Sequence, residues 1–115
     1  MKIMRKNNFC ERVYFLLNKI PKGRVVTYKQ IAEKLKSKGY RAVGNCLTKN
    51  RNLIKIPCHR VVRSNGEVGG YVLGSLKKEQ ILRKEGIEII KGKIDLEKFS
   101  YNFSSLPNTT TIALI

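Results

Sequence analysis

The sequence is poor in the residues that usually cross-link a small protein or bind a structural metal. It holds one histidine and three cysteines, and Cys10, Cys46 and Cys58 follow no regular spacing. Structural zinc sites use close pairs of ligands, which this chain does not offer, so no metal site is expected. No signal peptide or long apolar run precedes the cysteines. We therefore expect a reduced, cytoplasmic protein without a disulfide framework.

Acidic residues are also scarce. Eight aspartates and glutamates stand against 24 lysines and arginines, which gives a formal net charge of +16. The basic residues recur from Lys2 to Lys98 and do not form one terminal block, as expected of a folded surface that meets phosphates. A nucleic acid is therefore the favoured partner. An anionic membrane surface is disfavoured because no strongly basic amphipathic helix carries aromatic anchors. A basic domain without any polyanionic partner is the remaining alternative.

At 115 residues the chain is long enough for one domain with a single core. Apolar residues at helical spacing predict a first helix, with Asn8 as its N-cap and Glu11 as the reciprocal partner. Its buried stripe is predicted to be Phe9, Val13, Leu16, Leu17 and Ile20. Residues 21–24 have the composition of a turn, and Val25-Val26 is expected to be only an extended connector.

The next segment predicts a helix-turn-helix. Thr27 and Gln30 form a capping box at the start of one helix, and a further helix is expected from about Tyr40 to Lys49 after Gly39. Its inward residues are predicted to be Val43, Cys46 and Leu47. Its outward face is small and polar, with Arg41, Ala42, Gly44, Asn45 and Thr48. Such a face suits contact with a DNA groove, and the alternative is that Gly44 is a packing notch against another helix.

The second half of the chain is predicted to consist of turns around one more helix. Residues 64–67 have the composition of a tight turn, and the glycine-rich loop 69–74 lacks the Gly-Lys-Ser/Thr ending of a nucleotide-hydrolase loop. We expect this loop to line a pocket. Ser75 is expected to cap a last helix that ends at Gly86, and residues 87–94 a small hairpin. Residues 1–97 are then the domain, and residues 98–115 a tail of unassigned role.

The segment from Ile56 to Val62 carries the most chemistry, because Cys58 directly precedes His59. Neighbouring side chains on an extended strand point to opposite sides, so the two share a proton only where the chain turns, which Pro57 favours. A thiol beside a base indicates a nucleophile, and a buried structural cysteine beside a surface histidine is the alternative. Glu85, on the apolar side of the last predicted helix, requires a partner, either His59 or an arginine or lysine.

Five elements in order make residues 8–94 resemble the DNA-binding, active-site domain of the O6-alkylguanine-DNA alkyltransferases. They are Arg41-Ala42-Val43-Gly44-Asn45, Asn50, Ile56-Pro57-Cys58-His59-Arg60-Val61-Val62, Gly69-Gly70-Tyr71 with Gly74, and Lys84-Glu85-Gly86. The resemblance implies a mainly α, winged-helix-like domain with short β segments. It implies a monomer that repairs double-stranded DNA containing O6-alkylguanine and needs no metal or cofactor. In a prokaryote such a protein would be associated with the nucleoid.

The resemblance also implies a role for each matching residue. Cys58 is the acceptor in a single irreversible transfer, His59 the base acting through a water, and Glu85 the end of the relay. Arg41 fills the base stack when the damaged guanine flips out, and Tyr28 helps to rotate the nucleotide and donates a hydrogen bond to the leaving guanine. Asn50 is the hinge between the recognition helix and the active-site segment. The pocket wall is formed by Pro57, Val61, Tyr71 and Val72.

The chain departs from the family pattern in two places. Arg51 follows Asn50, where the family usually has proline, and almost nothing precedes the first helix, where most members carry another domain. A separately encoded chain is one possible source of that domain. Three other functions remain open: an alkyltransferase-like protein that binds lesions without transfer, a helix-turn-helix regulator, and a cysteine hydrolase. Cys58 argues against the first, because those proteins replace this cysteine with tryptophan.

Overall fold

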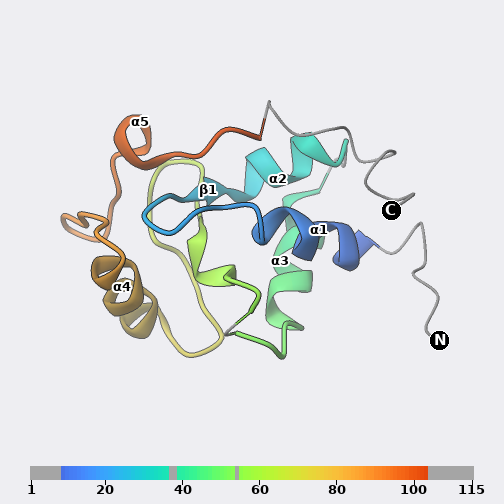
Figure 1. The fold of residues 1–115 in the computed structure, drawn as a ribbon, viewed down its shortest axis with the longest axis horizontal. Coiled ribbons are helices and arrows are strands. Elements are labelled where there is room, and N and C mark those ends of the chain that lie inside the picture. The colour runs from blue at the N-terminus through green and yellow to red at the C-terminus, as the bar shows by residue number, and fades with distance from the viewer. Residues whose placement is uncertain (1–8, 37–38, 54, 104–115) are drawn as a thin grey trace.

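The described chain is mainly helical, with one short parallel sheet (Figure 1), which confirms the expected fold class. The computed structural model describes residues 9–36, 39–53 and 55–103. Within these residues no helix is long and apolar enough to cross a bilayer. The elements are α1 (Phe9–Leu17), β1 (Val26–Thr27), α2 (Tyr28–Lys34), α3 (Tyr40–Thr48), the 3-10 helix η1 (Cys58–Arg60), β2 (Val61–Val62), α4 (Ser75–Lys84) and α5 (Leu96–Phe99).

Helix α1 buries the stripe that its sequence predicts. Val13, Leu16 and Leu17 are fully buried, as is Ile20 just beyond the helix, and Phe9 packs half-buried against the same core. Burial of each such side chain stabilises the fold by about 1.5–3 kcal/mol. The predicted cap Asn8 lies outside the described residues.

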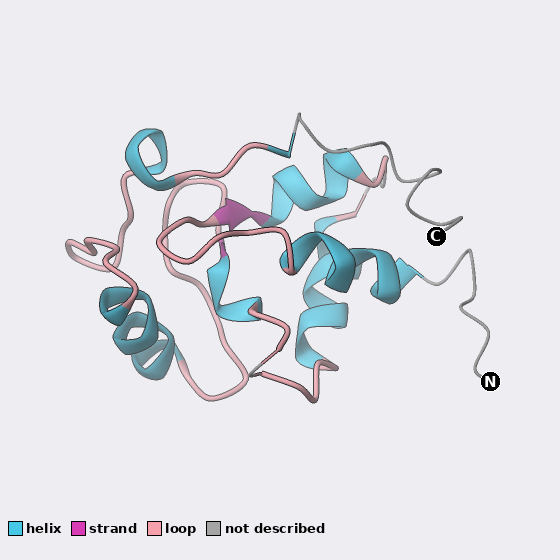
Figure 2. Ribbon diagram, viewed as in Figure 1, coloured by secondary structure: helices cyan, strands magenta, loops and turns pink. Residues whose placement is uncertain are grey.

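Strands β1 and β2 pair in parallel, with Val26 opposite Val61 and Thr27 opposite Val62. The expectation that Val25-Val26 is only a connector is therefore wrong. A two-residue strand leaves no alternating pattern in the sequence, and its partner lies far along the chain. Figure 2 shows these strands as the magenta segment between the helices. The pairing holds the residues after Cys58 beside the start of α2.

Helices α2 and α3 form the predicted helix-turn-helix. The Thr27 hydroxyl accepts a hydrogen bond from the Gln30 amide (3.0 Å), and Gln30 Oε1 accepts one from the Thr27 amide (2.9 Å), so the capping box is confirmed. Gly39 is the N-cap of α3. The inward residues Val43, Cys46 and Leu47 are buried as predicted, because α3 packs against both α1 and α2.

A disulfide joins Cys10 in α1 to Cys46 on the buried side of α3. The expectation of three reduced cysteines is therefore wrong. The two residues are 36 positions apart, yet the packing of α1 against α3 brings their Cα atoms to 5.2 Å, within the range that a disulfide spans. Their spacing in the sequence gave no sign of the bond because the contact is tertiary. Cys58 is the free cysteine of the three.

We expect Cys10→Ser to lower the free energy of unfolding of the oxidised protein by roughly 3 kcal/mol, because the disulfide closes a long loop in the unfolded chain. Thermal unfolding with and without reductant checks this. Reductant should bring the Tm of the wild type close to that of the variant and leave the variant unchanged. A wild-type Tm that does not respond to reductant would contradict the bond.

The start of α4 differs by one residue from the expectation. Gly74, with φ of 97°, is the N-cap, and Ser75 is the first helical residue and does not cap the helix. A positive φ at the cap favours glycine over serine. Helix α4 is also not the last helix, because α5 follows, with the Asp95 side chain accepting a hydrogen bond from the Glu97 amide. A four-residue helix is too short to leave a periodic pattern in the sequence.

The turn predicted at residues 64–67 and the hairpin predicted at residues 87–94 are both confirmed. The Gly66 amide donates to the Arg63 carbonyl and the Arg63 amide to the Glu67 carbonyl, which closes the turn at residues 64–67. Gly66 has φ of 92°, and a Cβ there would lie 2.6 Å from the Ile94 carbonyl oxygen, so glycine is required. Ile90 and Lys93 form an antiparallel bridge around the second turn, at residues 91–92.

Residues 99–103 pack on the domain. The Val25 amide donates to the Phe99 carbonyl (2.9 Å), and the Tyr101 amide donates to the Val25 carbonyl (2.8 Å). Phe99 and Phe103 are buried in the two halves of the core. The folded domain thus extends past residue 97. The apolar end at residues 109–115 lies outside the described residues.

Candidate active site

Cys58 begins the short helix η1 immediately after Pro57, where the chain turns. Its amide donates to the Ile56 carbonyl (2.8 Å), and the Arg60 amide donates to the Pro57 carbonyl (3.0 Å). This turn takes the chain out of the extended conformation, in which Cys58 and His59 would point to opposite sides. The Cys58 side chain is buried except at a cavity, with 4% of the residue exposed. The geometry places a free thiol at the end of a cavity.

Opposing influences act on the pKa of the Cys58 thiol. Burial raises the pKa of the thiol above its ordinary value, and a hydrogen bond from the Asn50 side chain and the charge of Lys78 act to lower it. Burial prevails, so the thiol is mostly protonated at neutral pH in the free protein. A nucleophilic step at this sulfur therefore requires a base to take its proton.

His59 lies at the back of the site, where Glu85 binds its ring. His59 Nε2 and Glu85 Oε2 are 2.9 Å apart. Arg60 binds the same carboxylate through Nε (3.0 Å) and Nη2 (2.8 Å), and its Nη1 donates to the Ile20 carbonyl. Both partners considered for Glu85, the histidine and an arginine, are therefore present. With Nε2 directed to Glu85, the other ring nitrogen, Nδ1, carries the basic lone pair of the neutral histidine.

The surroundings of His59, Glu85 and Arg60 favour a neutral histidine and an ionised glutamate. Burial lowers the pKa of His59, and this outweighs the hydrogen bond and charge of Glu85, which act to raise it. Burial acts to raise the pKa of Glu85, but the hydrogen bonds and charges of Arg60 and His59 prevail and lower it. At neutral pH His59 is thus a free base, and Glu85 orients it.

Asn50 holds the end of α3 to the Cys58 segment. Its Nδ2 donates to the Ile56 carbonyl (3.0 Å), and its Oδ1 accepts from the Asn52 amide (2.8 Å). These bonds brace both sides of the predicted hinge. The family's proline is replaced by the exposed Arg51, and none of these hydrogen bonds involves residue 51. Asn50 itself therefore holds the segment between α3 and Cys58.

Lys78 is a residue of the site that the sequence analysis missed. It is completely buried, and its Nζ donates to the carbonyls of Val61 (2.6 Å) and Gly70 (3.0 Å). Burial lowers its pKa to about 8, against a smaller opposing influence of Cys58. Lys78 lies four residues before the buried Leu82 and seven before Glu85, so helical spacing could have identified it.

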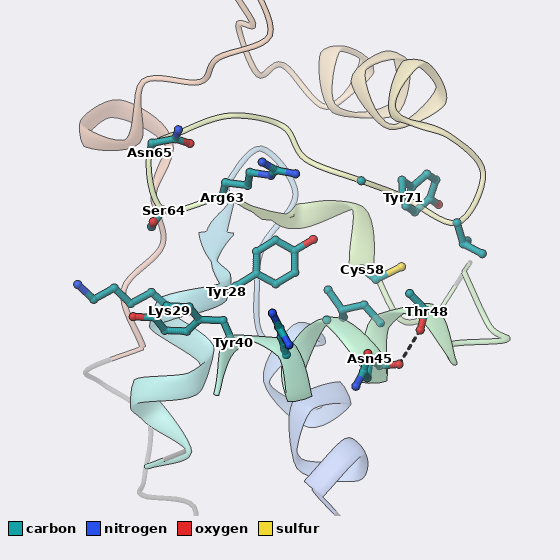
Figure 3. Close-up of a pocket in the computed structure, with 15 residues that line it drawn as sticks. Tyr28, Lys29, Tyr40, Asn45, Thr48, Cys58, Arg63, Ser64, Asn65 and Tyr71 are labelled. Carbon is teal, nitrogen blue, oxygen red and sulfur yellow. Dashed lines mark hydrogen bonds between the residues drawn. The ribbon is translucent and has the colours of Figure 1, made fainter. Parts of the chain in front are cut away.

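The cavity in front of Cys58 has a volume of about 750 Å³ and is open to solvent (Figure 3). Eight predicted site residues line it: Tyr28, Arg41, Gly44, Asn45, Thr48, Cys58, Tyr71 and Val72. The others do not line it: Ala42, Asn50, Pro57, His59, Val61 and Glu85. Pro57 and Val61 are buried beside the thiol, and His59, Glu85 and Asn50 lie behind it. Lys29, Tyr40, Arg63, Ser64 and Asn65 line the cavity without having been predicted.

The outward face of α3 forms one wall of the cavity. Arg41, Asn45 and Thr48 are exposed, and a Cβ on Gly44 would meet no atom within 4 Å apart from its own helix and chain neighbours. A packing notch would show a close neighbour at this position. The glycine is therefore not explained by packing within the described fold, and the small surface that it leaves faces the cavity.

The fold and the cavity define a class of protein: a helix-turn-helix domain with a buried free cysteine at the end of a cavity beside the second helix of the motif. Residues 8–87 match the family model described as 6-O-methylguanine DNA methyltransferase, DNA binding domain. The chain belongs to this family of DNA-repair domains.

Individual relatives agree with this assignment. The chain is 44% identical over 100 residues to a bifunctional methyltransferase/endonuclease of Picrophilus torridus. The matched region covers 86% of this chain and 34% of that protein. The structure resembles Pyrococcus kodakaraensis O6-methylguanine-DNA methyltransferase with a TM-score of 0.65 and 38% identity, over 70% of this chain and 47% of that one. The chain spans about a third to a half of the length of the curated relatives it matches.

One structural relative matches over almost its whole length. Atl1 of S. pombe, solved in complex with damaged DNA containing O6-carboxymethylguanine, superposes with a TM-score of 0.75 and 25% identity. The match covers 89% of this chain and 99% of Atl1.

Proposed function

We propose that this protein repairs O6-alkylguanine in double-stranded DNA by transferring the alkyl group to Cys58. The observation that carries the proposal is the free, buried thiol at the end of a cavity whose wall is the outward face of α3. A base inside a duplex cannot reach a buried sulfur, so the damaged guanine has to leave the stack. The cavity is large enough for an entire base.

The transfer is an in-line displacement at the alkyl carbon. His59 takes the thiol proton through a water, the sulfur forms a bond to the carbon, and the bond from carbon to guanine O6 breaks. The electron pair stays with the guanine, and Tyr28 donates a hydrogen bond to it as it leaves. Because the thioether cannot be hydrolysed, each molecule acts once. No cofactor or metal takes part.

We assign the DNA contacts to the outward face of α3. Arg41 at the start of α3 replaces the flipped guanine in the stack, and Asn45 and Thr48 lie against the groove. The net charge of +16 supplies the phosphate contacts, so affinity should fall steeply with salt.

The experiment is incubation with a duplex containing O6-methylguanine, followed by mass spectrometry of the peptide that holds Cys58. We expect one methyl group per protein molecule on that peptide. DNA binding with an unmodified Cys58 would favour the second candidate, a protein that binds lesions without transfer. The near-complete match to Atl1, which was solved bound to damaged DNA containing O6-carboxymethylguanine, is the observation that favours it.

Gly44 offers a test of the groove contact. Gly44→Ala should raise the free energy of unfolding by about 1 kcal/mol, because alanine is the better helix former and its Cβ meets open space. It should weaken DNA binding, because the added methyl group stands where a groove wall would approach. Thermal unfolding and a DNA titration measure the two effects. A variant that is stabilised and binds DNA as tightly as the wild type would remove Gly44 from the interface.

The pH dependence of transfer should report on His59. The base acts when neutral, and burial lowers its pKa below 6.5, so the transfer rate should fall on the acid side with a midpoint below pH 6.5. Glu85→Gln should move the midpoint lower still, because Glu85 acts to raise this pKa. Single-turnover transfer rates from roughly pH 4.5 to 8, a range that surrounds the pKa of an unperturbed histidine, check both statements. Glu88→Gln, at an exposed position nearby, is the control and should leave the midpoint unchanged.

A further inference from the structure

The cavity has two chemically different ends (Figure 3). Cys58, Tyr71 and Thr48 lie at one end, and Lys29, Ser64 and Asn65 lie at the other, with Tyr28 between them. Arg63 extends from the rim over Tyr28. The end away from the thiol thus offers a cation, a hydroxyl and an amide, and Arg63 adds a second cation between the two ends, a set of donors suited to phosphates.

The chemistry of an alkylated nucleotide matches this division. Guanine O6 and the nitrogen that carries the sugar are on opposite edges of the purine. When the alkyl carbon at O6 meets the Cys58 sulfur, the sugar and its phosphates therefore point toward the other end of the cavity. The residues at that end are the ones that a phosphate of the flipped nucleotide would meet.

Arg63 packs against the glycine-rich loop, and among the described residues its ion pair is a weak one. Its side chain lies across Gly69, where a Cβ would approach the Arg63 Cγ to 3.3 Å, so the positive φ of Gly69 and its lack of a side chain leave room for it. Arg63 forms an ion pair with Glu67 at 3.6 Å, between side chains that are 62% and 46% exposed. An exposed pair of this kind is weak and exchanges readily for a phosphate.

The influence of Arg63 reaches into the cavity. Burial raises the pKa of Tyr28, and the charge of Arg63 acts to lower it, so the guanidinium is close to the Tyr28 side chain. A cation at this point faces the space between the two ends, where the sugar of a bound nucleotide would lie.

We propose that Lys29, at the end of the cavity opposite Cys58, and Arg63, over Tyr28, bind the phosphates that flank the flipped-out nucleotide. The proposal rests on the proposed function and adds a phosphodiester subsite to it. The contact forms only when the nucleotide enters the cavity, so it stabilises the flipped state more than general binding to undamaged DNA.

Affinity measurements in the Cys58→Ala background test this without any transfer. Two duplexes are compared that differ only by O6-methylguanine in place of guanine. Arg63→Gln and Lys29→Gln should each weaken binding of the damaged duplex about tenfold and that of the undamaged duplex much less. Glu67→Gln should tighten binding of the damaged duplex, because it removes the competing carboxylate. Lys77→Gln, an exposed lysine of α4 outside the cavity, is the matched control and should leave the preference for damage unchanged.

Transfer from the free base O6-methylguanine is the second measurement, with Cys58 present. Arg63→Gln should slow transfer from the free base much less than transfer from the duplex, because the free base has no phosphate. Equal slowing with free base and duplex would overturn the subsite, since Arg63 would then act on the base or the thiol. Equal weakening of both duplexes would also overturn it. A wild type that transfers no methyl group refutes the proposed function alone, because the affinity comparison still decides the subsite.

Discussion

Cys58→Ala should abolish methyl transfer and leave binding to damaged DNA intact. The other two cysteines are joined in a disulfide, so Cys58 is the free thiol, and it lies at the end of the cavity. The substitution removes one buried sulfur and should cost only about 1 kcal/mol of stability. We expect no methyl group on the variant after prolonged incubation with the methylated duplex, and a Kd close to that of the wild type.

Cys10→Ser is the matched control for this experiment. It also removes one cysteine, but it leaves the sulfur in the cavity, so one methyl group per molecule should still appear on the Cys58 peptide. A methyl group on Cys58→Ala protein would mean that another side chain is the acceptor. Loss of DNA binding in Cys58→Ala with the fold intact would mean that the thiol serves recognition.

Lys78→Met should both slow transfer and change the stability profile with pH. The ammonium group of Lys78 lies close enough to Cys58 to lower the thiol pKa, so its loss should slow single-turnover transfer by about tenfold or more. Its ammonium group also joins the buried Val61 carbonyl to the partly exposed Gly70 carbonyl, and both acceptors lose this partner in the variant. Leaving the buried Val61 carbonyl without a partner costs about 1–3 kcal/mol.

The sign of the pH effect follows from the lowered pKa. Folded Lys78 releases its proton near pH 8 and unfolded lysine near 10.5, so the unfolded state binds more protons between these values. Stability contributed by this residue therefore rises with pH across that window, by about 3 kcal/mol in all. Urea unfolding at about pH 7, 8.5 and 10 covers most of this window. The free energy of unfolding should rise with pH in the wild type and should not rise in Lys78→Met.

The exposed neighbour Lys77 provides the control for that measurement. Lys77→Met removes the same charge from the same helix and should keep the wild-type pH dependence and transfer rate. If both variants lose the rise equally, the effect belongs to the net charge of the protein. If neither loses it, Lys78 is not the titrating group.

Local patterns predicted those parts of the fold that are stabilised locally. The capping box at Thr27, the buried face of α3 and the turn at residues 64–67 each depend on residues a few positions apart, so the sequence displays them. Strand β1, two residues long and paired with residues far along the chain, leaves no such pattern. Lys78 was missed because lysine is normally exposed, and only its place between two carbonyls explains its burial.

The amino-acid sequence predicts which chemical groups are available: a Cys-His pair after proline, an inward Glu85, a small polar helix face and an excess of positive charge. These are properties of residue types and short spacings. Which of these groups meet depends on the fold: Arg60 and His59 bind Glu85, Cys10 is bonded to Cys46, and Arg63 lies over Tyr28 at the rim of the cavity. Such contacts join segments far apart in the sequence, and packing of the helices, not local preference, sets their distances.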